Sequence, residues 1–229
     1  MLAIKKSANK NVAVKTVILF FPVVFVLSLL YLAFEPMVTG AVADSAVVSL
    51  SVTSEITISS PADTSLTPSI PGVTGNAGSP ATASLTWTVI TNNSAGFNVK
   101  LKSSTDPSLQ LDGSNTFSDY TNATPLNYTW QTPSASAAWF GFTVEPATAA
   151  DTVVAFLDNG SNTCGTGAVN GTNTCWGGLA TTDTDVINRT SATSSSGEAE
   201  VVKFWAESNA KFLNSGSYTA TITATAAMN

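Results

Sequence analysis

At residues 86–101 the chain reads TWTVITNNSAGFNVKL, two strand patterns on either side of one turn. Apolar side chains recur at every second position before and after the turn: Leu85, Trp87 and Val89, then Phe97, Val99 and Leu101. A period of two places neighbouring side chains on opposite faces of a sheet. The turn, Asn92–Gly96, holds residues that tolerate positive φ. The segment therefore predicts a β-hairpin with one buried face and one wet face.

The same period of two returns along most of the chain. It is clearest in VVSLSVTSEITIS, at residues 47–59. Further strand patterns occupy residues 140–144, 198–206 and 217–226. Residues 60–84 collect prolines and glycines, which are typical of a long connection. No segment after Phe34 has a helical period, so we expect an all-β sandwich of Ig-like or jelly-roll type over residues 47–229.

An uncharged run, TVILFFPVVFVLSLLYLAF, precedes this region at residues 16–34. It approaches the ~20 apolar residues that cross a bilayer as a helix. Four lysines and no acidic residue come before it, which marks residues 1–15 as a cytoplasmic flank. The sequence thus predicts one N-terminal hydrophobic helix in the membrane and places the rest of the chain outside, at the cell surface.

Three fates of this helix stay open. It can be a retained anchor in the cytoplasmic membrane, followed by a linker at residues 35–46. It can be a removed signal, because Ala41-Val42-Ala43 fits a small-x-small site and allows cleavage after Ala43, which would leave a secreted protein. It can also be a pilin-type assembly helix that starts at Asn9, although the early glutamate of bacterial type IV pilins is missing there.

The charge balance argues against one class of partner. The chain carries nine basic and fifteen acidic residues, and after Phe34 the balance is five against fifteen. Nucleic acids and anionic lipid surfaces select basic patches, so we expect no nucleic acid as partner. Charged residues make up only 10% of the chain, against ~25% in ordinary soluble domains. Serine, threonine and asparagine take their place, as is typical of extracellular β-proteins.

The sequence offers little for catalysis. It contains no histidine, the commonest general base and metal ligand, and we expect no metal centre. Two carboxylate pairs remain, Asp183 with Asp185 and Glu198 with Glu200. Alternation places each pair on one face, which we expect to be solvated. We therefore predict that the protein is not an enzyme.

Cys164 and Cys175 are the only cysteines. Outside the membrane such a pair predicts a disulfide, because a metal site needs more ligands and a redox pair favours Cys-x-x-Cys. Nearby, the segment Asp158–Asn162 has oxygen ligands at alternate positions, as calcium loops do, but lacks the terminal glutamate of an EF-hand. We expect a plain turn there, with calcium as the alternative and no other cofactor.

Five tryptophans provide the candidate ligand site. Exposed aromatic rings stack on sugars, and Trp176, Trp130 and Trp139 are our candidates for a glycan-binding surface. We expect Trp176 to be the best exposed, because it lies beside Cys175 and two glycines follow it. The other interpretation is that Trp87, together with Trp139, fills the core of the sandwich.

Six asparagines begin the acceptor sequence Asn-x-Ser/Thr: Asn92, Asn122, Asn127, Asn159, Asn170 and Asn188. In a chain so rich in asparagine, serine and threonine, chance explains most of them. They matter only in an organism with extracellular N-glycosylation.

Three segments together resemble a loose class of bacterial surface proteins: ITISSPAD (56–63), TWTVITNNSAGFNVKL (86–101) and GSYTATITATA (216–226). These proteins join an export signal to a Ser/Thr-rich β-sandwich and include the WxL-type wall-associated proteins. The Trp-x-Leu pair of that type is not matched, because two residues separate Trp176 from Leu179. The resemblance implies a non-enzymatic role in surface assembly, adhesion or matrix formation.

We therefore expect a structural surface protein, a subunit of a filament or layer that assembles through β-strands, with other copies of itself or other surface proteins as partners. The segments 47–59 and 217–226 are the strands that could add to a neighbouring subunit. The alternative is an adhesin that binds glycans through exposed aromatic residues.

Overall fold

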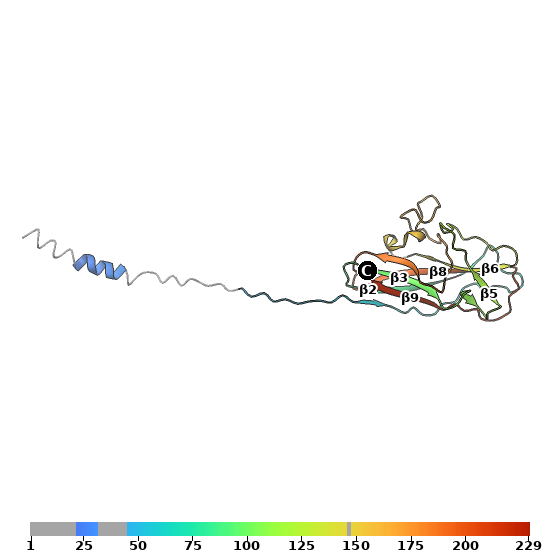
Figure 1. Cartoon of the computed structure of the whole chain (residues 1–229), viewed down its shortest axis with the longest axis horizontal. Coiled ribbons are helices and arrows are strands. Elements are labelled where there is room, and N and C mark those ends of the chain that lie inside the picture. The colour runs from blue at the N-terminus through green and yellow to red at the C-terminus, as the bar shows by residue number, and fades with distance from the viewer. Residues whose placement is uncertain (1–21, 32–44, 146–147) are drawn as a thin grey trace, which may run out of the picture. The chain divides into compact units, whose positions relative to one another are not determined.

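The computed structural model describes residues 22–31, 45–145 and 148–229 (Figure 1). The chain divides into two units, Met1–Ser51 and Val52–Asn229, each of which is described by itself. In the first unit residues 22–31 are helical, and residues 45–51 form neither helix nor strand.

The predicted membrane helix falls only partly on described residues. Residues 1–21 and 32–44 lie outside them, and with them the lysine flank, both ends of the 16–34 run and the cleavage site after Ala43. Among the described residues, no helix is both long enough and apolar enough to cross a membrane. The membrane span stays a prediction.

The second unit is built mainly from strands. The described residues hold β1 (Ile56–Ile58), β2 (Ala81–Thr91), β3 (Phe97–Ser103), β4 (Leu109–Gln110), β5 (Thr116–Asp119), β6 (Ala137–Val144), β7 (Thr184–Arg189), β8 (Glu198–Asn209) and β9 (Ile222–Met228). Two short 3-10 helices, η1 (Ala149–Asp151) and η2 (Val154–Phe156), lie between β6 and β7. The prediction of a mostly β fold is confirmed.

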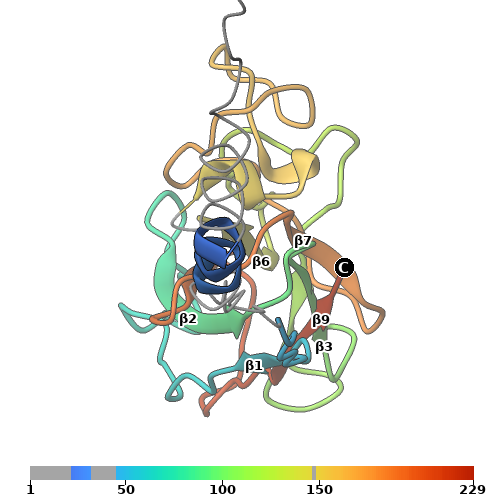
Figure 2. The ribbon, with the colours of Figure 1, turned by 90° about the vertical axis from the view of Figure 1, so that its left-hand side faces the viewer.

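These strands form two sheets. The larger sheet has the order β1-β2-β8-β6-β5-β4, and the smaller sheet has the order β7-β3-β9. Neighbours are antiparallel except for β5 and β6, which are parallel. Figure 2 shows β2 on one side of the unit and β7, β3 and β9 on the other, with β1 close to β9.

One apolar core lies between the two sheets. The larger sheet contributes alternate side chains of β2, β6 and β8: Trp87, Val89, Phe140, Phe142, Val144, Val202 and Phe204. The smaller sheet contributes side chains of β3 and β7: Phe97, Val99, Leu101, Val186 and Ile187. The prediction that Trp87 is a core residue is confirmed, since only 6% of its surface is exposed.

The predicted hairpin at residues 86–101 is wrong. The two strands exist, but β2 pairs with β1 and β8 while β3 pairs with β7 and β9, so the turn carries the chain from one sheet to the other. Both strands turn their odd-numbered side chains into the same core, and this alternation is the same whether two strands pair or face each other. Gly96 is required in the turn, because a Cβ there would lie 2.0 Å from the carbonyl oxygen of Arg189.

The strand patterns at residues 47–59 and 217–226 form strands that are shorter than expected or displaced along the chain. Of residues 47–59, only Ile56–Ile58 form a strand, and residues 45–55 have none. The pattern at 217–226 becomes a strand at Ile222–Met228. In contrast, the pattern at 198–206 forms β8 with Val202 and Phe204 in the core, as expected.

Candidate functional site: an open groove between the sheets

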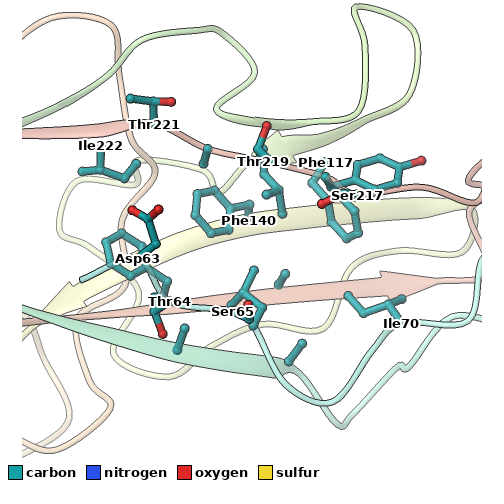
Figure 3. A pocket seen from close by; sticks show the side chains of 18 of the residues that line it. Asp63, Thr64, Ser65, Ile70, Phe117, Phe140, Ser217, Thr219, Thr221 and Ile222 are labelled. Carbon is teal, nitrogen blue, oxygen red and sulfur yellow. The ribbon is translucent and has the colours of Figure 1, made fainter. Parts of the chain in front are cut away.

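A groove of about 1420 Å³ opens between the two sheets along one side of the second unit. Its floor is the inner face of the larger sheet, where the aromatic and aliphatic side chains include Leu85, Trp87, Phe140 and Phe204. Figure 3 shows Phe140 at the floor, with Asp63, Thr64 and Ser65 from one wall and Ser217, Thr219 and Thr221 from the other. The groove is therefore apolar at its base and hydroxyl-rich at its rim.

The first wall of the groove exists because β1 is short. β1 pairs with β2 over Ile56–Ile58 only, whereas β2 continues to Ala81. Residues 60–73 follow β1 and contain three prolines, which lack the N–H needed for a continuous ladder. They meet β2 through a single bridge, Thr67 to Thr82. The predicted connection at residues 60–84 is confirmed up to residue 80, because β2 already begins at Ala81, and it leaves the floor beside β2 open.

The second wall is β9 and the residues before it. β9 pairs with β3 on one edge; among the described residues no strand is hydrogen-bonded to its other edge, although β1 lies close to it. Its inward side chains Ile222, Ala224 and Ala226 are only half-buried. Their register partners on β3 are Ser103, Leu101 and Val99, which are 2%, 0% and 1% exposed. The core is thus sealed under β3 and open beside β9.

A second unpaired feature precedes β1. Residues 45–55 form no strand, and Figure 1 draws them as an extended trace. Val47, Val48, Leu50 and Val52 are 91%, 95%, 89% and 79% exposed. Apolar side chains in a period of two suit a strand that is half-buried, and here they have nothing to cover them.

The side chain of Asn92 fixes the end of this segment nearest to β1. Its Oδ1 accepts the backbone N–H of Glu55 at 2.7 Å, and its Nδ2 donates to the carbonyl oxygen of Thr53 at 2.9 Å. Thr91 Oγ1 also donates to the carbonyl oxygen of Glu55, at 2.6 Å. Residues 53–55 are therefore held to the turn that follows β2. Sequence reasoning noted Asn92 as a turn residue and a glycosylation acceptor and missed this role.

The three tryptophans predicted as a ligand site come together in one aromatic cluster. Trp130 stacks on Tyr120, with ring centroids 4.5 Å apart, and lies edge-on to Trp176 at 5.2 Å. Tyr120 in turn meets Trp139 at 5.6 Å, and Trp176 meets Trp205 at 4.3 Å. Trp139 and Trp205 alternate with core residues of β6 and β8, so the cluster lies on the outer face of the larger sheet.

Trp176 is not the exposed residue that we expected. Its side chain is completely buried, and its indole N–H donates to the carbonyl oxygen of Asn173 at 2.9 Å. The glycines after it allow close packing instead of forming an open loop: a Cβ at Gly178 would lie 2.0 Å from the carbonyl oxygen of Tyr120. Trp130 and Trp139 are half-buried. Glycan binding at the cluster stays a prediction, without Trp176 as its exposed ring.

A buried carboxylate that the sequence did not single out anchors the cluster. Glu207, which is 0% exposed, accepts the indole N–H of Trp130 and the backbone N–H of Gly78, both at 2.5 Å. Charge-assisted hydrogen bonds of this kind are the stronger ones in proteins. Glu207 lies two residues after Trp205, so the period of two could have placed it on the face of the tryptophans.

The predicted disulfide is confirmed between Cys164 and Cys175. In the nearby segment, Asp158 is 2% exposed and its Oδ1 accepts the N–H of Gly160 at 2.7 Å. Asn159 Oδ1 accepts the N–H of Ser161 at 2.8 Å. These are the bonds of Asx turns, which favour the plain turn over a calcium loop. In the described part of the chain, no group of three or more Cys, Asp or Glu side chains could hold a metal ion.

The two carboxylate pairs have different surroundings. Asp183 and Asp185 are exposed, as expected, near Lys102 and Lys100. The expectation of a solvated face is wrong for Glu200, which is 1% exposed. The reason is the parity of β8, because residue 200 shares the inner face with the core residues Val202 and Phe204.

Glu200 belongs to an acidic cluster around one arginine. Arg189 Nη1 lies 2.6 Å from Asp151 Oδ2 and 3.3 Å from Glu198 Oε2. Neither carboxylate oxygen of Glu200 has a hydrogen-bond partner among the described residues. Burial, reinforced by the nearby carboxylates of Asp151 and Glu198, raises the pKa of Glu200 to about 8. Glu200 is therefore a protonated, structural acid at neutral pH.

These features separate the groove from the other candidates. The disulfide and the acidic cluster are closed by contacts within the unit, and the aromatic cluster leaves Trp130 and Trp139 half-buried. The groove combines half-buried apolar side chains with an unpaired strand edge on β9. Comparison with family models, curated proteins and solved structures finds no match for this chain.

Proposed function

We propose that this chain is a structural protein of the cell surface, a subunit that self-associates by adding a β-strand to the open groove. The observation that supports the proposal most strongly is the unpaired edge of β9 beside an apolar floor. An unpaired strand edge accepts another strand through main-chain hydrogen bonds. A large exposed apolar surface typically marks a binding site.

The rest of the chain supports the same proposal. The second unit is taken to be a β-sandwich of Ig-like or jelly-roll type, displayed outside the membrane and tethered or exported through residues 16–34. Its charged residues are few, and hydroxyl side chains cover the outer face of β9 at Thr223 and Thr225. We propose a non-enzymatic role. The side chains of Glu200 and Glu207 are both buried, and Glu207 accepts a hydrogen bond from the indole N–H of Trp130.

Assembly of the full chain tests the proposal. The full chain would be purified in mild detergent, and after detergent removal its size would be followed by light scattering and its form by negative-stain electron microscopy. Ala224→Glu places a charge on the groove wall, whereas Thr225→Glu places the same charge on the outer face of β9, outside the groove lining. We expect assembly in the wild type and in Thr225→Glu, and its loss in Ala224→Glu.

Two outcomes would overturn the proposal. One is a wild-type chain that stays monomeric at high concentration after detergent removal. The other is equal assembly of the two charge variants. Near-ultraviolet circular dichroism of both variants checks that the unit remains folded, so that a loss of assembly is read only from folded protein.

A further inference from the structure

We propose that the strand entering the groove is residues 47–53 of a second copy of this chain. The inference rests on the proposed self-association and names its donor. Val48, Leu50 and Val52 would face the apolar floor, and their side chains are the exposed face of a segment that has no strand partner. The acceptor would be the free edge of β9.

The length of the donor fits the groove. The floor follows β2 from Ala81 to Trp87, a span of about 20 Å at ~3.3 Å per residue. Residues 47–53 cover the same distance as a strand. Small side chains at Ala83 on the floor and Ala224 on the second wall leave room for the branched side chains of the donor.

The polarity of the donor fits as well. With Val48, Leu50 and Val52 inside, Ser49, Ser51 and Thr53 would face outward. That outer row would continue the row formed by Thr223 and Thr225 along β9. The segment from residue 45 to 54 carries no charge, so its insertion buries no ion beside the apolar floor.

The hydrogen bonds of Asn92 favour a donor from another copy over the chain's own segment. Ile56 pairs opposite Thr91, at the far end of β2 from Ala81. To enter its own groove, the segment would have to reverse direction at residues 53–55. Those residues are held to Asn92 and Thr91, and they contain no glycine or proline for a tight turn. Self-insertion would break these bonds.

A donor segment and a groove at different places on one chain make a head-to-tail contact. Each copy would give its segment to one neighbour and receive a segment from another. Such heterologous contacts build rings when the rotation closes and open filaments when it does not. The inference therefore deepens the proposed function from self-association to a directional strand exchange.

Cross-linking between two single-cysteine variants tests the donor directly. Leu50→Cys would be introduced into a tagged full-length chain, and Leu85→Cys, on the groove floor, into an untagged one. Both native cysteines are already bonded to each other, so the new thiols are the only free ones. After mixing, detergent removal and mild oxidation, we expect a tagged–untagged dimer that disappears on reduction.

Matched controls separate the donor from the assembly itself. Ser51→Cys points outward in the proposed register and should cross-link to Leu85→Cys at least fivefold less than Leu50→Cys does. Assembly without any Leu50–Leu85 cross-link would overturn the donor assignment but leave the proposed function standing. Equal cross-linking by Ser51→Cys would overturn the register. Absence of assembly in the wild type would overturn both proposals.

Discussion

The inward side chains are fully buried on the sealed side of the core, under β3, and half-buried on the open side, beside β9. Both strands nevertheless have the same alternation of inward and outward side chains. Phe97, Val99 and Leu101 of β3 alternate inward and are 0–1% exposed. Ile222 and Ala224 of β9 alternate inward in register with β3 and are half-buried. The difference lies in the neighbours, because β3 has a strand on both edges and β9 has one. Burial is set by what lies beside a strand as much as by its own alternation.

The sealed side has additional cover. η1 packs beside β7, and Phe156 of η2 meets Phe142 of β6 with ring centroids 5.3 Å apart. The open side has only the proline-containing residues 60–73 on one wall. We therefore expect the sealed side to carry the stability of the isolated unit, and the open side to carry its association.

Truncation on each side of the core gives the largest expected difference. Phe97→Ala should lower the free energy of unfolding by about 3–5 kcal/mol, as large-to-small changes in sealed cores do. Ile222→Ala, at a half-buried site, should cost about 1 kcal/mol in the unassembled chain. Urea unfolding followed by tryptophan fluorescence measures both values. Equal losses would contradict the division into a sealed and an open side.

Because Glu200 is buried on the sealed side, we expect the free energy of unfolding to depend on pH. Its pKa rises from 4.5 to about 8 on folding, so between these values the folded chain holds a proton that the unfolded chain has lost. The contribution of Glu200 to the free energy of unfolding should therefore be fully present below pH 4.5 and be lost as the pH rises through about 8. At about 1.4 kcal/mol per pKa unit, the change is on the order of a few kcal/mol.

Glu200→Gln tests this dependence, since glutamine cannot ionise. The variant should lose most of the fall in melting temperature between pH 5 and pH 8.5 and should be more stable than the wild type at pH 8.5. Asp185→Asn is the control, because its carboxylate is exposed and is not among the charges that shift the pKa of Glu200. An unchanged slope in Glu200→Gln would show that another group is responsible.

Removal of the disulfide should have a smaller effect on the sealed side. The bond joins Cys164 to Cys175, directly before the buried Trp176. For a loop this short, the double change to alanine should lower the free energy of unfolding by about 2–3 kcal/mol. It should also shift the fluorescence of the tryptophan cluster toward the solvent-exposed range. A loss near zero would mean that packing around Trp176 holds the loop without the bond.

The sequence predicted the type of structure better than its connections. Alternation found the strands β2, β3, β6 and β8, and the cysteine pair gave the disulfide. Alternation could not distinguish a hairpin from a crossing between sheets at Asn92–Gly96, because both arrangements bury the same side chains. It also could not show which strands end at an edge, since the pairing partners of β9 and β1 are set by residues far along the chain.

The candidate sites show the same limit. Composition identified Trp130, Trp139 and Trp176 as related, and the structure brings them together, but exposure could not be inferred from neighbouring glycines. The groove arises because no strand of the described residues pairs with the second edge of β9, and no sequence motif marks a missing partner. The alternation of residues 47–53 was visible in the sequence, where residues 47–59 were predicted both as a strand of the sandwich and as a strand that could add to a neighbouring subunit; their exposure was not.

Substitution of Asn92 should have the smallest effect on stability. It tests the point at which the open side meets the segment before β1, at residues 53–55. Asn92→Ala removes the two hydrogen bonds to Thr53 and Glu55 and should lower the free energy of unfolding by only about 1 kcal/mol, because both bonds are exposed. Its effect on the amide of Glu55 should be larger, with hydrogen exchange there accelerated at least tenfold while exchange in β3 is unchanged. Ser94→Ala, in the same turn, is the control. If exchange at Glu55 stays slow without Asn92, the bond from Thr91 is enough to hold residues 53–55, and the direction of the donor segment depends on Thr91 instead.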